Sequence, residues 1–273
     1  MGLPRMVMIV ALWVQILLQT PQVESQEFKM TMEYNAFDDQ YTGCEKKMDS
    51  KAPQLLKGEK RGNKVLRDAW DSAETKWQKE IKKKVSPLPP GFKKQYGIAV
   101  IMYTNKTFSK DFNRAVWTNG MSLEDYKKKF NYKAIHFYLT RALQLLPKVN
   151  FTTKLYRGSQ VKFTHRGTGP MRFGQFCSTS QDRSISENFG TRTFYTIHAC
   201  LGVSIKKFSY FPEEEEVLIP GTEVFHVSAK KGNGAFILKS TSKPLSCFNC
   251  ALLGNEKNAA CKSAHQVKWS PAI

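Results

Sequence analysis

The pattern of apolar residues changes at Pro147, and this change constrains the fold of the chain more than any other feature. Before Pro147, apolar residues recur at intervals of three and four, as in helices with one buried face. Beyond it, short β-rich runs are separated by glycines, and no helical pattern alternates with them. We therefore expect no doubly wound parallel sheet but an α+β fold, with an N-terminal helical half packed on a mostly antiparallel β core of two small sheets.

Specific elements follow from the same patterns. A histidine, His136, lies within the third predicted helix without a partner one turn later, so we interpret it as structural. Helices are predicted over residues 63–84, 109–118 and 132–146, with a further helix start at 122–125. Strands are predicted over residues 154–157, 174–180, 193–198, 204–208, 216–219, 222–229 and 235–240.

The two ends of the chain indicate secretion. Residues 1–25 contain Arg5, then an apolar run, then polar residues, which is typical of a signal peptide rather than a membrane span. The C-terminus has no apolar tail of the kind that a lipid anchor requires. We expect a secreted, extracellular protein whose residues 26–273 form a single catalytic domain. Its helical part would span about 26–150, its β-rich part about 151–245 and its disulfide-tied tail 246–273.

Six cysteines follow the signal peptide, an even number that suits three disulfides in an oxidising compartment. Fifteen pairings are possible from the sequence alone. The spacing of the cysteines does not favour a zinc site, so we expect no metal. Asn105 and Asn150 each begin an acceptor pattern for N-glycosylation, which predicts that both lie on the surface.

Four consecutive glutamates, residues 213–216, stand out in a chain with a formal net charge of +19. They follow Pro212 and run into three aliphatic residues, which predicts an acidic turn that opens onto a buried strand. Because side chains alternate along a strand, Glu214 and Glu216 would share one face. The alternative is a solvated acidic loop that pairs with the surplus lysines.

Three motifs, in order and spacing, resemble a known signature. They are Leu155-Tyr-Arg-Gly158, Gly174-Gln-Phe-Cys-Ser-Thr-Ser180 and Glu214-Glu-Glu216-Val-Leu-Ile-Pro220. Together they are similar to the arginine, serine and glutamate signature of the extracellular arginine-specific mono-ADP-ribosyltransferases. The likeness spans nearly all of the chain beyond residue 25, and it is greatest to the secreted branch of the family.

The resemblance implies an ADP-ribosyltransferase-like fold and an enzyme that transfers a single ADP-ribose from NAD to arginine side chains of extracellular proteins, releasing nicotinamide. NAD would be a co-substrate, with no prosthetic group. Arg157 beside Gly158 would bind phosphate or ribose, and Ser178 would hold the glutamate or the ribose. Glu216 would stabilise the sugar cation, and Glu214 would grip the acceptor guanidinium.

The resemblance also implies that Phe189 stacks on nicotinamide, although from the residues alone core packing is the preferred interpretation. It pairs Cys44 with Cys250. Cys247 with Cys261 and Cys177 with Cys200 then remain, and the last pair is in doubt because it would attach a disulfide beside the active strand. A free Cys177 would make the enzyme sensitive to thiol reagents.

Two other functions fit the sequence. The first is an NAD glycohydrolase, in which water replaces the arginine acceptor. The second is a non-enzymatic secreted protein that binds polyanionic surfaces through its positive charge and lysine runs such as 82–84 and 127–129. We expect no specific nucleic acid partner, no transmembrane span and a monomer.

Overall fold

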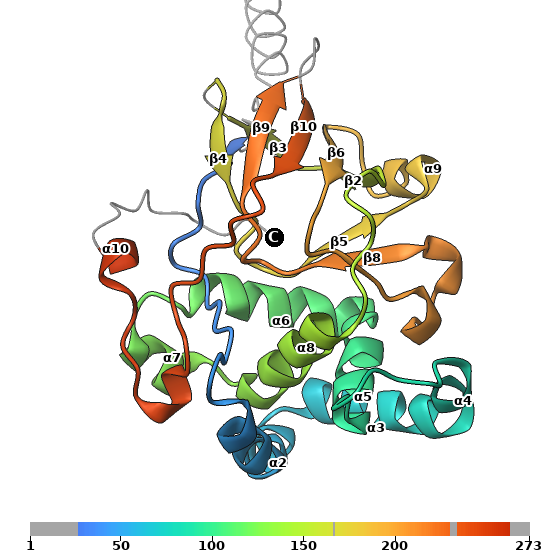
Figure 1. Cartoon of the computed structure of the whole chain (residues 1–273), viewed down its shortest axis with the longest axis vertical. Helices are drawn as coiled ribbons and strands as arrows, with labels where there is room; N and C mark the ends of the chain where they lie inside the picture. The colour runs from blue at the N-terminus through green and yellow to red at the C-terminus, as the bar shows by residue number, and fades with distance from the viewer. Residues whose placement is uncertain (1–26, 166, 230–233, 263–273) are drawn as a thin grey trace, which may run out of the picture.

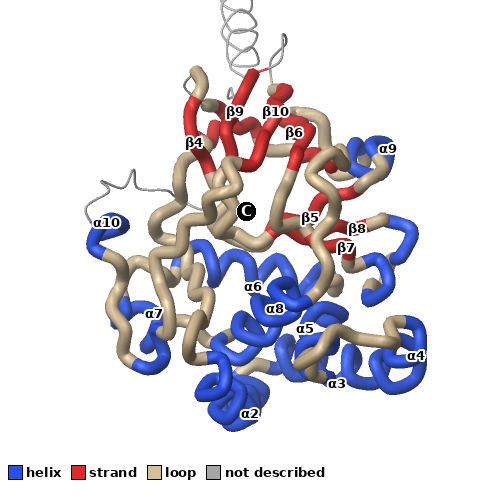
Figure 2. Tube along the Cα trace, viewed as in Figure 1, coloured by secondary structure: helices blue, strands red, loops and turns tan. Residues whose placement is uncertain are grey.

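The computed structural model of the chain describes residues 27–165, 167–229 and 234–262. The predicted signal peptide, residues 1–25, lies outside them. Helices gather on one side of the molecule and strands on the other, which confirms the α+β class (Figures 1 and 2). Within the described residues, no helix is long and apolar enough to cross a membrane.

The helices from α2 to α8 precede the large sheet in the chain, and three of them begin with a side-chain cap. Asn63, Asn105 and Ser122 each accept a hydrogen bond from the backbone N–H three residues later, which satisfies a donor that the helix leaves free. The helices are α2 (Glu45–Gly62), α3 (Lys64–Lys76), the π-helical turn η1 (Trp77–Ile81), α4 (Lys82–Lys84), α5 (Lys94–Tyr103), α6 (Lys106–Thr118), α7 (Leu123–Lys129) and α8 (Lys133–Leu145).

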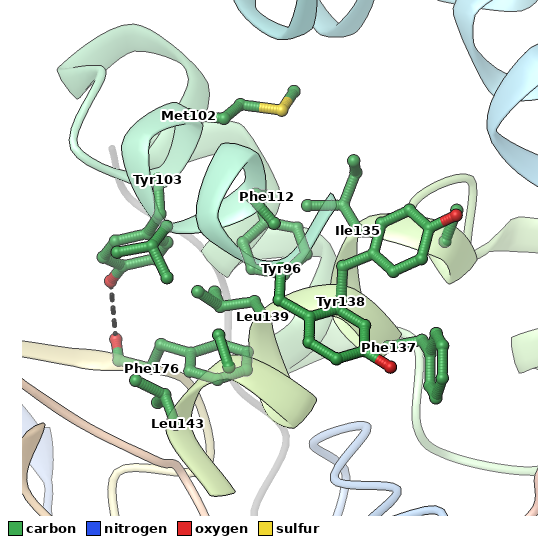
Figure 3. Close-up of a cluster of buried hydrophobic side chains, with 14 of the residues drawn as sticks. Tyr96, Met102, Tyr103, Phe112, Ile135, Phe137, Tyr138, Leu139, Leu143 and Phe176 are labelled. Atoms are coloured by element: carbon green, nitrogen blue, oxygen red, sulfur yellow. Dashed lines mark hydrogen bonds between the residues drawn. The ribbon is translucent and has the colours of Figure 1, made fainter. Parts of the chain in front are cut away.

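Helices α5 and α8 pack against each other at the centre of the helical half. Residues 96–103 of α5 are all buried, so this helix is enclosed on every side. The rings of Tyr103 of α5 and His136 of α8 both contact Phe176, which comes from the segment before the sheet strand β5 (Figure 3 shows Tyr103 and Phe176). The hydroxyl of Tyr103 donates to the carbonyl of Phe176 at 3.1 Å. The core of the helices thereby reaches the sheet.

The β core consists of two unequal sheets: eight strands in the order β4-β9-β10-β6-β2-β5-β8-β7, and the pair β1-β3. In the large sheet β10 runs parallel to β6, and all other neighbours are antiparallel. The strands are β1 (Glu27–Lys29), β2 (Leu155–Ser159), β3 (Lys162–Thr164), β4 (Gly169–Met171), β5 (Cys177–Ser180), β6 (Thr193–His198), β7 (Val203–Ser204), β8 (Glu216–Ile219), β9 (Phe225–Ala229) and β10 (Ala235–Ser240).

The C-terminal segment crosses back to the start of the helical half. The carboxylate of Asp38 accepts from the backbone N–H groups of Cys247 and Phe248, and Asp39 accepts from those of Cys250 and Ala251. The segment carries the short helices η4 (Ala251–Leu253) and α10 (Ala259–Lys262). One disulfide, Cys44–Cys250, joins it covalently to the helical half, and a second, Cys247–Cys261, lies within the segment.

Candidate active site

One cavity of about 310 Å³ lies where β2, β5 and β8 approach the ends of α5 and α6. The short helix α9 (Arg183–Glu187) and the turn before β8 complete its wall. The six residues that the sequence singled out for catalysis or ligand binding all line this cavity. They are Arg157, Gly158, Ser178, Phe189, Glu214 and Glu216.

Strand pairing brings three of these residues together. Strand β5 lies between β2 and β8 in the sheet. Ser180 of β5 pairs with Tyr156 of β2 on one side and with Glu216 of β8 on the other. Arg157, Ser178 and Glu216 therefore come from three adjacent strands, which hold them in fixed relation to one another.

Glu216 is a buried carboxylate at the first position of β8. Its residue is 7% exposed. The pKa of Glu216 is raised to about 7, mainly by burial and to a smaller extent by the neighbouring Glu214, while a hydrogen bond from Ser178 and the charges of Arg157 and Lys106 act in the opposite direction. Near neutral pH both the carboxylate and the carboxylic acid of Glu216 are thus populated.

Ser178 is supported from the helical side by residues that the sequence analysis missed. The hydroxyl of Tyr103, at the end of α5, lies 3.4 Å from the Ser178 Oγ. Asn113 Nδ2 of α6 donates to the Tyr103 hydroxyl at 2.9 Å and to the Phe176 carbonyl at 3.1 Å. This network attaches the serine strand to α5 and α6. Neither Tyr103 nor Asn113 belongs to a motif in the sequence that could have revealed it.

Arg157 is held against the backbone of the neighbouring strand. Its Nη1 donates to the carbonyl of Ser178 at 2.8 Å. The role of Gly158 is steric: a Cβ atom there would lie 2.2 Å from the carbonyl oxygens of both Ser186 and Gly190. The absent side chain lets α9 and the following loop approach β2 and close one wall of the cavity.

The acidic run is a turn that leads into a strand, as predicted, but the strand starts later than the argument from alternating side chains assumed. Glu214 ends the 3-10 turn η3 (Pro212–Glu214), and Glu215 adopts a left-handed conformation with φ of 47°. The left-handed turn at Glu215, and not the alternation of side chains along a strand, lets Glu214 and Glu216 line the same cavity. The alternative interpretation, a solvated acidic loop that pairs with lysines, applies to Glu213, which is exposed, and to Glu215, which pairs with Lys206.

Phe189 is 49% exposed, so the preferred interpretation of this residue as part of the core was wrong. Phe189 lines the cavity together with Lys106, the first residue of α6, which the sequence analysis did not consider. The Lys106 Nζ lies 2.8 Å from Glu214 Oε1 and 4.6 Å from the ring centre of Phe211. Lys106 is thus the cation that balances Glu214 in this structure.

The cysteines form two disulfides in the described residues: Cys44–Cys250, the pair that the resemblance implied, and Cys247–Cys261, one of the two pairs that then remained. The doubtful third pair does not form. Cys177 is a buried free thiol, and Cys200 is a half-buried one. Burial raises the pKa of Cys177 to about 11, so this thiol is protonated and shielded near neutral pH, which argues against the expected sensitivity to thiol reagents.

The two sequons differ in exposure. Asn150 is exposed, and its Oδ1 accepts from the backbone N–H and the hydroxyl of Thr152 at 2.9 Å and 2.8 Å. Asn105 is half-buried, and its Oδ1 caps α6 by accepting from the Phe108 N–H at 3.1 Å. The amide nitrogen that carries a glycan is not used in either contact. Within the described residues, no group of three or more His, Cys, Asp or Glu side chains is arranged to hold a metal ion.

The arrangement combines a buried carboxylate, a hydroxyl beside it and a guanidinium on the neighbouring strand. A buried anion with fixed donors around it can stabilise positive charge that develops on a sugar ring. The guanidinium can bind phosphate or ribose oxygens. The cavity therefore suits the cleavage of a bond between a sugar and a leaving group in a substrate that carries phosphate.

Comparison with known proteins gives a consistent result. Residues 30–246 match the model of the family NAD:arginine ADP-ribosyltransferase. The chain is 42% identical over 240 residues to ecto-ADP-ribosyltransferase 5 of Bos taurus, covering 84% of this chain and 75% of the relative. It is 45% identical over 238 residues to T-cell ecto-ADP-ribosyltransferase 2 of Mus musculus, covering 84% and 78%.

Solved structures agree with the sequence comparison. A mutant of the eukaryotic mono-ADP-ribosyltransferase ART2.2, in complex with NADH, superimposes with a TM-score of 0.74 at 40% identity. The match covers 82% of this chain and 98% of that structure. Another mutant of the same enzyme, in complex with NAD, gives a TM-score of 0.73. With the family model spanning most of the described residues, the chain belongs to the NAD:arginine ADP-ribosyltransferases.

Proposed function

We propose that Glu216 is the catalytic anion in the reaction of this family, the transfer of a single ADP-ribose from NAD to an arginine side chain. As the bond from nicotinamide to ribose breaks, its electron pair leaves with nicotinamide and positive charge develops on the ribose. An arginine nitrogen then forms the new bond to the ribose carbon and releases a proton. The observation that carries this proposal is the burial of Glu216 between Ser178, Arg157 and Glu214.

NAD would bind along β2 and β5. Arg157, fixed on the Ser178 carbonyl, presents its remaining N–H groups to a phosphate or ribose oxygen. Gly158 lets α9 and the loop after it pack against β2, so these segments form the cavity wall beside the ligand. Phe189 offers an exposed ring at the entrance, which suits stacking on nicotinamide. Complexes of ART2.2 with NAD and NADH support the choice of this ligand.

Glu214 would bind the acceptor. Its carboxylate is 20% exposed, lines the same cavity as Glu216 and already carries one cation, Lys106. A carboxylate can hold a guanidinium through two parallel hydrogen bonds, which would place an arginine nitrogen beside the ribose. Arginine-containing proteins outside the cell are the proposed targets.

Secretion of this chain is part of the proposal. The relatives are named as ecto-enzymes, and the two disulfides suit an oxidising compartment. The apolar run near the N-terminus of the sequence provides the signal peptide that such a route requires.

The first prediction tests the catalytic anion. Glu216→Gln keeps the shape of the side chain but removes its charge, so transfer to arginine and hydrolysis of NAD should both fall by about two to four orders of magnitude. Labelled NAD and polyarginine measure transfer, and nicotinamide release without an acceptor measures hydrolysis. Turnover within a few fold of the unmodified enzyme would reject the assignment.

The second prediction separates the two glutamates. Glu214→Gln removes the charged contact to the guanidinium but leaves Glu216 in place, so transfer to arginine should collapse while NAD hydrolysis persists. Glu215→Gln is the matched control, because Glu215 lies between them in the chain and pairs with Lys206 outside the cavity. Equal loss of both activities in Glu214→Gln would assign Glu214 to NAD binding or folding instead.

A further inference from the structure

Lys106 is surrounded by groups that suit a guanidinium. Its Nζ lies 2.8 Å from Glu214 Oε1, 4.6 Å from the ring centre of Phe211 and 5.5 Å from that of Phe189. A carboxylate with adjacent aromatic faces binds arginine at least as well as lysine, because the planar guanidinium can both pair with the carboxylate and stack on a ring. We call Glu214 and Phe211 the cation site, and Phe189 remains available to nicotinamide.

The cation site adjoins the cavity, and Lys106 is held there only loosely. Glu214 and Lys106 line the cavity, whereas Phe211 lies outside its lining, directly before Pro212, the first residue of η3. The Lys106 side chain is 58% exposed, and an ion pair with that exposure is weak. Because Lys106 starts α6, its side chain can move into solvent without disturbing the helix core.

We propose that the cation site is the binding site for the acceptor guanidinium and that Lys106 occupies it in the free enzyme as a built-in competitor. An incoming arginine displaces the lysine and takes its contacts to Glu214 and Phe211. This inference rests on the acceptor role proposed for Glu214 and adds Phe211 as a second contact. Lys106 then sets how strongly an arginine must bind before it is modified.

The test is the Michaelis constant for a small acceptor, arginine methyl ester, at saturating NAD. Lys106→Ala empties the cation site, so the KM for arginine methyl ester should fall about threefold to tenfold, the range for one exposed ion pair with a ring contact. The KM for NAD should not fall in parallel. This substitution leaves Asn105 and Thr107 in place, so the glycosylation pattern is unchanged.

Two further variants sharpen the test. Lys110→Ala is the control, because it removes the same charge one turn later on α6 from a residue that does not line the cavity, and it should leave both constants unchanged. Lys106→Arg puts a better ligand into the cation site, so the KM for arginine methyl ester should rise above that of the unmodified enzyme.

The outcomes distinguish the two proposals. If the unmodified enzyme does not transfer ADP-ribose to arginine methyl ester, the acceptor role of Glu214 fails and this inference fails with it. If the enzyme does transfer but Lys106→Ala keeps its KM for the ester, only the competition is rejected. A raised KM for NAD in Lys106→Ala, with the KM for the ester unchanged, would assign Lys106 to the phosphates of NAD and would also overturn the inference.

Discussion

Glu216 occupies a position in which the fold and its proposed catalytic role make opposite demands. The proposed role requires the carboxylate, because only the anion stabilises a sugar cation. The fold favours the neutral acid, since burial raises the pKa of Glu216 from 4.5 to about 7. Ser178, Arg157 and Lys106 partly offset this effect of burial. An enzyme that works near neutral pH therefore keeps a charge that weakens its own native state.

This conflict predicts that a variant without catalytic charge is more stable. Because the folded pKa of Glu216 exceeds the unfolded value, its contribution to stability is full below about pH 4.5 and is lost as the pH rises through 7. Glu216→Gln should therefore raise the free energy of unfolding by about 1–3 kcal/mol at pH 8 and by little at pH 4.5. Denaturant unfolding at the two pH values measures this.

The control for the stability measurement is Glu213→Gln, an exposed carboxylate in the same turn. Its substitution should leave the free energy of unfolding within a few tenths of a kcal/mol at both pH values. A Glu216→Gln variant that is destabilised at pH 8 would show that the carboxylate contributes more through its hydrogen bond with Ser178 than it costs through burial.

At the scale of elements, the sequence predicted best those strands that are bounded by glycine or proline and have a clear apolar pattern. Strands β6, β8 and β10 span residues 193–198, 216–219 and 235–240, as predicted. The largest helices that the sequence analysis missed are α2 and α5. In α2, Pro53 lies inside the helix and only three residues are buried, so the apolar stripe is thin.

Helix α5 shows why a helix that is buried on all sides lacks the periodic pattern of apolar and polar residues by which helices are predicted. All residues from Tyr96 to Tyr103 are buried, so apolar residues do not alternate with polar ones. Glycine is unfavourable in the interior of a helix. At Gly97, however, a Cβ atom would lie 2.2 Å from the ring of Trp77, so the packing requires glycine. The glycine lets the π-helical turn η1 pack directly on α5. Such a contact between distant segments leaves no local pattern in the sequence.

The candidate site shows the same difference between local motifs, which the sequence reveals, and contacts between distant segments, which it does not. Arg157, Ser178 and Glu216 could be proposed from their motifs, because each motif is local. Their assembly depends on β5 lying between β2 and β8, which is a property of the sheet. Lys106 and Tyr103 are brought to the cavity by helix packing, so no spacing in the sequence indicated them.

At the scale of the molecule, the segments near the two ends of the described chain are joined by hydrogen bonds between buried groups. Asp38 pairs with the fully buried Arg172 and also accepts backbone hydrogen bonds from the C-terminal segment. Burial raises the pKa of the neighbouring Asp39 to about 6 even though it accepts hydrogen bonds from Cys250 and Ala251. These contacts connect the first segment, the sheet half and the C-terminal segment at one place.

The Cys44–Cys250 disulfide closes a loop with a sequence separation of 206, while Cys247–Cys261 spans only 14. If a disulfide acts mainly by restricting the unfolded chain, the longer loop should contribute more, by about 2 kcal/mol from the logarithmic dependence on length. Replacing Cys44 and Cys250 by serine should therefore lower the free energy of unfolding by about 2–5 kcal/mol, and replacing Cys247 and Cys261 should lower it by less.

Denaturant unfolding of both double variants makes the comparison, with Cys200→Ser as the control for loss of a cysteine outside any disulfide. If both double variants lose the same stability, the disulfides act through packing of the C-terminal segment on Asp38 and Asp39, and the length of the closed loop is irrelevant.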